Sequence, residues 1–342
     1  MSGNKKIEEG LEHIKAAEKS LKTSLLKWRP DYEIAADEYS KAATCFRNAK
    51  SFEQCKDCLL KATECHKQNR SLFYAARMLD QAILVCKELG DLREVPALAD
   101  RACNMYQTHG SADAGASSLD KAAKLLEQHS PEQALQLYQR AAEVALIQDN
   151  TRLGAECTSK VHRLMVKLQM FDQAADAIRR EIGLQSQGEQ YNAMGRLAVA
   201  LVLVQIARGD QVAAEKAFKE WGNYCDAAEI QTLEMLLQAY DDDDADNARR
   251  ALNSSFIKNM DVEYARLARD LPLPQGVQCP PKASVRENAA PSYVSPNSQT
   301  TVAATIEDAR PAEESDPASG DPSASAGPEK RASDDEYEGG LC

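Results

Sequence analysis

Cysteines are the residues whose type and spacing in this chain could most readily do chemistry. Cys55 and Cys58 form a C-x-x-C pair, with Cys45, Cys65 and His66 close by in the sequence. Such a pair can be a redox couple or part of a zinc site. Both cysteines fall inside a predicted helix, however, and a buried free cysteine behaves as a small apolar residue. We therefore expect core packing without a metal or a cofactor, and redox or zinc chemistry is the competing interpretation.

An acidic run over 241–246 is the second stretch that could hold a ligand. A calcium loop needs glycine at its sixth position and glutamate at its twelfth, whereas this chain has Asp246 and Leu252 there. We expect a solvated turn instead. The sequence has no glycine-rich phosphate loop, no H-E-x-x-H and no G-x-S-x-G. The chain is therefore predicted not to be an enzyme.

The elements that must position any functional residue are predicted from a repeat, which is clearest at 130–145. Ser130 suits a helix N-cap and Pro131 the first helical position. Small, large and small residues then follow on one helical face, at Ala134, Tyr138 and Ala141. Small residues let a neighbouring helix approach closely, and the large residue fills the groove between helices.

The same pattern recurs at intervals of about twenty residues, which is one helix with its turn. Its first small position falls at Ala35, Cys55, Ala75, Val95, Gly115, Ala134, Gly154, Ala174 and Ala213. A fixed period of this size indicates stacked helices that bury one another's apolar faces. The sequence thus predicts an all-α fold, a right-handed superhelical solenoid of antiparallel helix pairs. The pairs are similar to tetratricopeptide repeats but span about forty residues.

Helix ends are predicted from capping signals. Capping-box spacings indicate helix starts at Ser51, Asp91 and Ser130, with Gln54, Glu94 and Gln133 as the respective third residues. Glycines indicate helix ends at Gly90, Gly110 and Gly209.

Composition divides the chain into five segments. Ten of the 13 prolines lie beyond residue 271, among Ser, Ala, Gly and acidic residues that cannot form a core. We predict an N-terminal helix and apolar loop over 1–30, and a repeat array over 31–228. A C-terminal helical cap over 229–271, a disordered linker over 272–333 and an acidic motif over 334–342 follow.

Charge and hydropathy exclude several classes of protein. The net charge is −12, and the 5 basic and 12 acidic residues from Pro272 onward account for −7 of it. An acidic chain without a basic tract is a poor candidate for binding nucleic acid. The longest apolar run, 197–204, is too short to span a bilayer, and no secretory signal is recognised. We expect a soluble, cytoplasmic protein with reduced cysteines.

Large apolar residues and basic residues meet between the first two predicted helices. Leu25, Leu26 and Trp28 precede Pro30, and the basic residues among them are Lys22, Lys27 and Arg29. One interpretation is the packed end of the first helix. The other is a loop whose apolar side chains enter a membrane surface while its cations meet anionic headgroups.

Several stretches resemble the soluble NSF attachment proteins (SNAPs), and among them the gamma type. They are 8–13 (EEGLEH), 26–32 (LKWRPDY), 131–139 (PEQALQLYQ), Met260-Asp261, 335–337 (DEY) and 339–342 (GGLC). The similarity extends over about 1–271 and the last nine residues. The linker between these parts is longer than the family leads us to expect.

The resemblance implies an adaptor that binds SNARE complexes, syntaxin-containing four-helix bundles, and recruits the hexameric ATPase NSF to take them apart. NSF binding would involve Asp334, Asp335, Glu336 and Leu341, in the family's acidic tail with its penultimate leucine. SNARE binding would involve Lys160 and Arg196, which fall on basic positions of the family. Ser117 and Glu156 stand where alpha-type relatives carry lysine, which puts the strength or range of SNARE binding in question.

The resemblance also favours membrane contact by Leu25, Leu26 and Trp28, with peripheral association at ER, Golgi and endosomal vesicle membranes. The alternative function is a generic scaffold similar to tetratricopeptide proteins that holds a peptide or another partner. A groove lined by Lys, Arg and Asn from successive helices would favour that alternative.

Overall fold

A computed structural model describes residues 2–23 and 28–274 of this protein. The predicted linker beyond residue 274 and the acidic motif over 334–342 lie outside the described residues. Leu25, Leu26 and Lys27 also lie outside them. Within the described part, the chain consists of helices joined by turns, and no strand occurs there.

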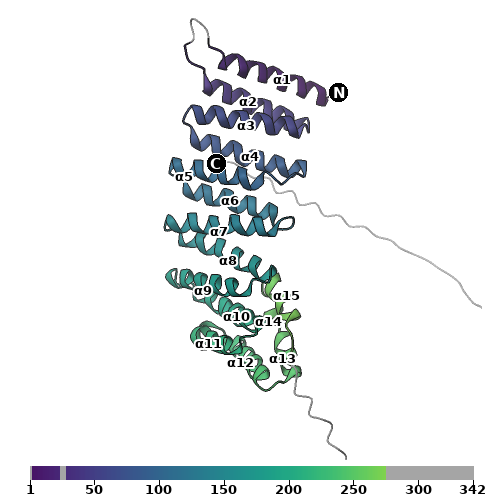
Figure 1. Cartoon of the computed structure of the whole chain (residues 1–342), viewed down its shortest axis with the longest axis vertical. Helices are drawn as coiled ribbons and strands as arrows, with labels where there is room; N and C mark the ends of the chain where they lie inside the picture. The colour runs from purple at the N-terminus through teal and green to yellow at the C-terminus, as the bar shows by residue number, and fades with distance from the viewer. Residues whose placement is uncertain (1, 24–27, 275–342) are drawn as a thin grey trace, which may run out of the picture. The chain divides into compact units, whose positions relative to one another are not determined.

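Helices follow one another along the chain with short connections (Figure 1). They are α1 (Ser2–Leu21), α2 (Tyr32–Asn48), α3 (Phe52–Gln68), α4 (Leu72–Leu89), α5 (Val95–His109), α6 (Ala112–Leu126), α7 (Pro131–Ile147), α8 (Thr151–Lys167), α9 (Phe171–Gln187), α10 (Tyr191–Ala207), α11 (Gln211–Trp221), the 3₁₀ helix η1 (Gly222–Tyr224), α12 (Ala227–Asp241), α13 (Ala245–Leu252), α14 (Ser255–Lys258) and α15 (Val262–Asp270).

Successive helices pack on one another through the predicted small–large–small faces. Ala35, Ala75 and Ala134 are fully buried, and Tyr138 is 1% exposed. A Cβ atom added at Gly115 of α6 would lie 3.3 Å from the Cys103 carbonyl oxygen of α5, so the backbones of these two helices approach closely there. Helix contacts run from each helix to the next through α1–α10. The predicted all-α solenoid of antiparallel helix pairs is therefore confirmed.

Polar contacts tie helices that are one repeat apart. Asp80 of α4 accepts a hydrogen bond from Ser118 of α6, and it also accepts one at 2.7 Å from the Tyr106 hydroxyl of the intervening α5. Arg140 of α7 pairs with Asp100 of α5 at 2.5 Å. Even-numbered and odd-numbered helices thus form two layers, each with its own cross-repeat contacts, and residues about forty apart occupy equivalent positions.

None of the three predicted capping boxes forms. Two of the predicted helix starts are nevertheless correct, and the third is wrong. The helices begin at Phe52 and Pro131 as predicted, but neither preceding serine caps the backbone with its side chain. Ser51 Oγ instead donates to Gln54 Oε1 at 2.5 Å. Asp91 does not cap α5, which begins four residues later. A complete capping box occurs at Asp226, where none was predicted.

The predicted glycine stops are confirmed. Gly90 and Gly110 end α4 and α5 with φ values of 72° and 89°, and Gly209 follows α10 with φ 81°. Glycine adopts this left-handed conformation without the steric cost that a Cβ imposes.

The C-terminal helices do not simply continue the stack. After α12, the chain turns back so that α15 packs against α8 and α10 (Figure 1). The Tyr240 hydroxyl donates to the Pro272 carbonyl at 2.8 Å and holds the chain beyond α15 against α12. Within the acidic run, residues 242–244 form the turn between α12 and α13, and Asp244 caps α13, in agreement with the expectation of a solvated turn.

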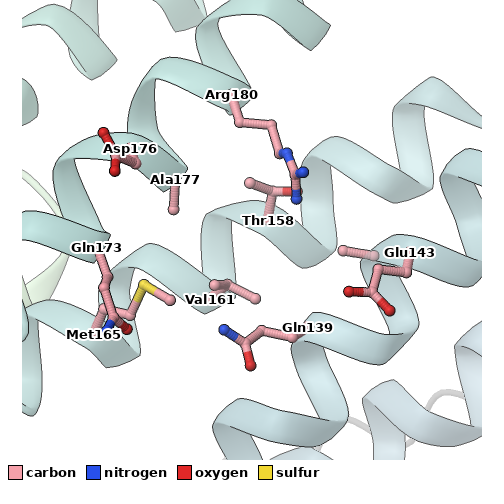
Figure 2. A pocket seen from close by; sticks show the side chains of 10 residues that line it. Gln139, Glu143, Thr158, Val161, Met165, Gln173, Asp176, Ala177 and Arg180 are labelled. Atoms are coloured by element: carbon pink, nitrogen blue, oxygen red, sulfur yellow. The ribbon is translucent and has the colours of Figure 1, made fainter.

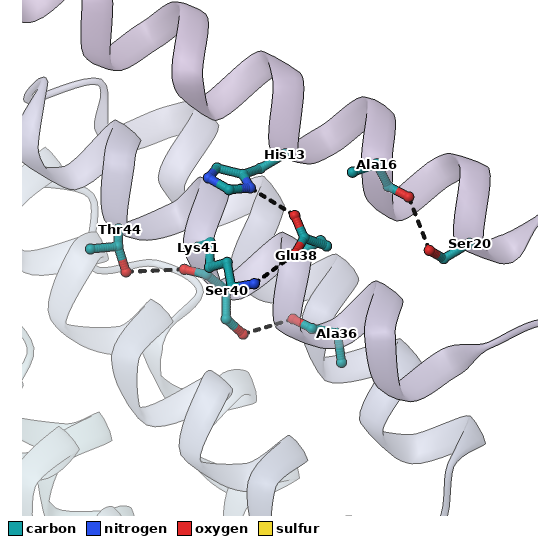
Figure 3. Close-up of polar contacts among 8 residues, drawn as sticks. All are labelled: His13, Ala16, Ser20, Ala36, Glu38, Ser40, Lys41 and Thr44. Carbon is teal, nitrogen blue, oxygen red and sulfur yellow. Dashed lines mark hydrogen bonds and ion pairs between the residues drawn. The ribbon is translucent and has the colours of Figure 1, made fainter.

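A polar cluster joins helix α1 to α2 (Figure 3). The Glu38 carboxylate of α2 lies 2.7 Å from both His13 Nδ1 of α1 and Lys41 Nζ. Next to it, a Cβ atom at Gly10 would lie 2.9 Å from the Phe46 ring. These hydrogen bonds from Lys41 first, and then from His13, lower the pKa of Glu38.

We predict that Glu38→Gln makes the array less stable at neutral pH by about 0.5–1 kcal/mol, because the contact is partly exposed. Since the folded-state pKa of Glu38 lies below its usual 4.5, this stabilisation is present above that value and is lost as pH falls through the folded-state pKa. Urea unfolding of the parent and the variant at pH 7 and at pH 3 measures the loss of stability and its dependence on pH. Glu64→Gln, which removes an ion pair within α3 alone, is the control. An equal Glu38→Gln effect at both pH values would contradict the assignment.

Candidate interaction surface

The cysteine pair lies in the core and not at a site. Cys55 and Cys58 of α3 are 0% and 1% exposed. Burial raises the pKa of both thiols, that of Cys58 to about 12. Both thiols therefore stay protonated at neutral pH and pack as small apolar side chains. Across residues 2–23 and 28–274, no group of three or more His, Cys, Asp or Glu side chains could hold a metal. The expectation of core packing is confirmed.

Lys160 is mostly buried and is paired within the array, which the sequence alone does not indicate. Its ammonium group on α8 pairs with Asp120 of α6, one repeat away, and lies 5.7 Å from the centre of the Tyr138 ring. The side chain is only 29% exposed. Much of its charge is therefore neutralised by a contact that also links two repeats.

Arg196 of α10 is exposed, and it has no ion pair within the described residues. It borders an open hollow of about 650 Å³ among α8, α10, α12, α14 and α15. Lys160 borders a neighbouring hollow of about 790 Å³. The two hollows share lining residues, among them Ser159 and Asp261, and so form one continuous depression. The structure thus brings Lys160 and Arg196 to one face of the molecule.

Two further cations belong to the layer of even-numbered helices. Lys121 and Lys124 of α6 are exposed, and neither has an ion pair in the part of the chain that the structure describes. Lys124 lies one helical turn after Asp120, whose charge is already balanced by Lys160. Neither lysine was predicted from the sequence to be a binding residue. The repeat could have pointed to them, because residues about forty positions further on form the equivalent turn of α8, which carries Lys160.

A series of hydrogen bonds between buried polar side chains forms the floor of the depression. His162 of α8 lies with Nε2 2.5 Å from Glu181 Oε2 of α9, and its Nδ1 lies 2.5 Å from the Tyr264 hydroxyl of α15. Gln185 Nε2 donates to the other Glu181 oxygen at 3.1 Å. His162, Glu181 and Tyr264 are at most 5% exposed. Three helices, including the returning C-terminal one, are therefore joined by polar atoms that have little access to water.

Burial first, and then the carboxylates of Glu181 and Asp261, raise the pKa of Tyr264 well above its usual value. The tyrosine therefore keeps its proton. The geometry is satisfied when the Tyr264 hydroxyl donates to His162 Nδ1 and Nε2–H donates to the Glu181 carboxylate. These hydrogen bonds position α15 and thereby shape the wall of the depression beside Arg196.

A second hollow lies among α7, α8 and α9, where Figure 2 shows its lining side chains. Its volume is about 440 Å³, and its floor includes Val161 and Met165. Its charged lining residues are Glu143, Asp176 and Arg180. A single arginine beside two carboxylates is not the run of basic and amide residues that the generic peptide-holding alternative requires. This hollow therefore gives that alternative no support.

Among the residues predicted to contact a membrane, only Trp28 can be placed. Its side chain is 89% exposed, so it does not pack against the end of α1. Leu25 and Leu26 lie outside the described residues. So do Asp334, Asp335, Glu336 and Leu341. Within residues 2–23 and 28–274, no helix has the length and the apolar character needed to cross a bilayer.

Comparisons with known proteins agree with this architecture. A family model described as soluble NSF attachment protein, SNAP, matches residues 8–254. The chain belongs to the soluble NSF attachment protein family. The match includes α2 to α12 and therefore every helix that carries Lys121, Lys124, Lys160 and Arg196.

Individual relatives include both gamma-type and alpha-type SNAPs. The chain is 26% identical over 274 residues to the gamma-soluble NSF attachment protein of Dictyostelium discoideum, covering 79% of this chain and 84% of that protein. It is 25% identical over 259 residues to the gamma-type protein of Arabidopsis thaliana, with coverage of 75% and 89%. It is 26% identical over 246 residues to the alpha-type protein of Vitis vinifera, with coverage of 70% and 84%.

Among solved structures, the chain overlaps aspartyl phosphate phosphatase F of Bacillus subtilis. The TM-score is 0.35 and the identity 12%, over 75% of this chain and 60% of that chain. SNAP family proteins are adaptors in SNARE- and NSF-related processes and are not enzymes.

We predict that Tyr264→Phe in this SNAP destabilises the fold by about 1–3 kcal/mol, because it leaves His162 Nδ1 buried without a partner. Urea unfolding of the full chain measures the loss. Tyr191→Phe is the matched control, since Tyr191 is 53% exposed and its replacement should leave stability unchanged. If Tyr264→Phe lowers stability no more than the control does, the buried hydrogen bonds of His162 do not hold α15 in place.

Proposed function

We propose that this protein is an adaptor that binds SNARE complexes, recruits NSF and stimulates its ATPase, so that SNARE bundles are disassembled during vesicle transport and membrane fusion. The observation that carries the proposal is the family match over residues 8–254. Its wider setting would be the cytoplasmic surface of ER, Golgi and endosomal vesicle membranes, with peripheral attachment through Leu25, Leu26 and Trp28.

The exposed cations of the even-numbered layer support the SNARE-binding part of this proposal. A four-helix bundle is a rod, and a stack of helices offers such a rod an extended surface. Lys121, Lys124 and Arg196 lie on that layer without ion pairs in the described part of the chain. Their charges are therefore free to attract an acidic rod and to speed its encounter with the array.

Lys160 has a different role in this proposal from the one that the sequence suggested. Because it pairs with Asp120 and lies over Tyr138, its removal would leave a carboxylate unbalanced between two repeats. We propose that Lys160 chiefly fixes the spacing of α6 and α8, and that Arg196 contacts the SNARE bundle directly.

NSF binding is proposed for the acidic end of the chain. Asp334, Asp335 and Glu336 supply negative charge, and Leu341 supplies a single large apolar side chain beside it. Charge of this kind would draw the segment to a basic surface of the ATPase. Leu341 would then give the contact an apolar anchor.

A charge-reversal experiment tests the proposal at the SNARE complex. Lys121→Glu combined with Lys124→Glu is expected to weaken binding of a purified SNARE complex about tenfold at physiological salt, since each reversal replaces attraction by repulsion. The dependence of binding on salt should fall as well. Fluorescence anisotropy with a labelled SNARE complex measures both changes.

The control is Arg101→Glu combined with Lys216→Glu, which reverses two exposed charges on odd-numbered helices. This control should bind like the parent. Equal weakening by the two double variants would show that only net charge matters. No binding by the parent would contradict the adaptor function itself.

A further inference from the structure

The hollow among α7, α8 and α9 has no part in the proposed binding of SNARE complexes or NSF. Its walls are α7 and α9, two odd-numbered helices of successive repeats, and α8, on which both of them pack, forms its floor (Figure 2). Its volume of about 440 Å³ leaves room for several side chains of another molecule. We call this hollow the α7–α9 groove.

The register between repeats explains why the groove stays open. Between α5 and α7, Asp100 and Arg140 form an ion pair across the odd-numbered layer, and they are 40 residues apart. One repeat further along the chain, the same two positions are Arg140 and Arg180. Two arginines repel each other, and Arg140 is already paired. Within the described residues, this position therefore gives no ion pair between α7 and α9.

The polar side chains along the groove have no partners of their own. Arg180 of α9 and Glu143 of α7 are exposed, and neither side chain forms an ion pair or a hydrogen bond in the part of the chain that the structure describes. The same holds for the side-chain amides of Gln139 and Gln173. Figure 2 shows the Arg180 side chain extending toward Thr158 of α8. The groove thus presents one cation on one wall and one anion on the other.

Between these two charges the groove is apolar. Its floor includes Val161 and Met165, which stand one helical turn apart on α8. Ile147 lies on the same stripe of α7 as Glu143, one turn further on, and its side chain is 72% exposed. An apolar strip with a charged position on either side is the surface that one helix of a coiled coil presents to another.

We propose that the α7–α9 groove binds an amphipathic helix of a partner protein. Apolar side chains of this helix lie on the floor, an acidic side chain faces Arg180 and a basic side chain faces Glu143. The inference goes beyond the proposed function and does not depend on it. Lys121 and Lys124 belong to the even-numbered layer, so the chain is able to hold this helix and a SNARE complex at the same time.

A helix fits the groove better than an extended segment does. An extended segment brings unpaired backbone N–H and C=O groups that the groove has to satisfy. Among the lining residues only the amides of Gln139 and Gln173 are suited to that task. A helix pairs its own backbone groups and needs the groove only for its side chains. The occupant is therefore recognised by its apolar seam and its two flanking charges.

A phage-displayed library of short helices, varied on one face, provides the probe. Helices are selected on the full parent chain, and their binding as labelled synthetic peptides is measured by fluorescence anisotropy. We expect the selected helices to carry an apolar seam with an acidic residue on one side and a basic residue on the other. A saturating amount of SNARE complex should leave their binding unchanged.

Glu143→Lys combined with Arg180→Glu reverses the polarity of the groove without changing the net charge. This variant is expected to bind the selected peptides about tenfold more weakly, because both charged contacts become repulsive. Exchanging the acidic and basic residues of a peptide should restore its binding to the variant. The matched control is Lys216→Glu combined with Glu220→Lys, which exchanges two exposed charges on α11 and should bind like the parent.

Several results would overturn the proposal. Selection of no helix above background would show that the groove holds none. Equal affinity of the parent and the reversed variant, or no recovery with the exchanged peptide, would place the contact elsewhere. Parent-like binding by a peptide with proline in the middle of its seam would point to an extended ligand. Displacement of the peptide by the SNARE complex would move its site to the even-numbered layer.

Failure of this inference and failure of the proposed function give different results. A parent that binds SNARE complexes but selects no helix overturns only this inference. A parent that binds the selected helices with the expected dependence on Glu143 and Arg180, but binds no SNARE complex, contradicts only the proposed function.

Discussion

Close packing of small residues between successive helices is the constraint on which the rest of the structure depends. Ala35, Ala75 and Ala134 are fully buried at equivalent positions, and at Gly115 of α6 a Cβ atom would lie 3.3 Å from the Cys103 carbonyl oxygen of α5. Helices that approach this closely have a fixed spacing and register. Residues about forty apart therefore stand in line, and this turns a repeat in the sequence into a continuous surface.

The same register decides which charges stabilise the fold and which remain available to a partner. Asp120 and Lys160 face each other across one repeat and balance each other. Lys124 stands one turn beyond Asp120 and has no ion pair in the described part of the chain. An array of this kind therefore holds its helices together with some of its surface charges and leaves others, such as Lys124, without an ion pair in the described part of the chain.

Much of the fold follows from the sequence because its signals are local. The small–large–small spacing gave the helix faces, and Gly90, Gly110 and Gly209 gave helix ends. The return of α15 could not be derived, since it depends on a bond between His162 and Tyr264, which are 102 residues apart. Lys160 was recognised as a basic position, but its pairing with Asp120 depends on the register between repeats. The capping box predicted at Ser51 does not form, because the Ser51 hydroxyl donates to the Gln54 side chain and its side chain does not cap the helix backbone.

The central claim is that this SNAP links SNARE complexes to the ATPase through its acidic end, and the ATPase rate of NSF tests it most directly. The rate is measured with assembled SNARE complexes and either the full chain or its Leu341→Ala variant. The account predicts that the full chain raises the rate and that the variant binds the SNARE complex normally but gives little stimulation. Equal stimulation by both chains would contradict the role of the acidic end. No stimulation by the full chain would contradict the adaptor function as a whole.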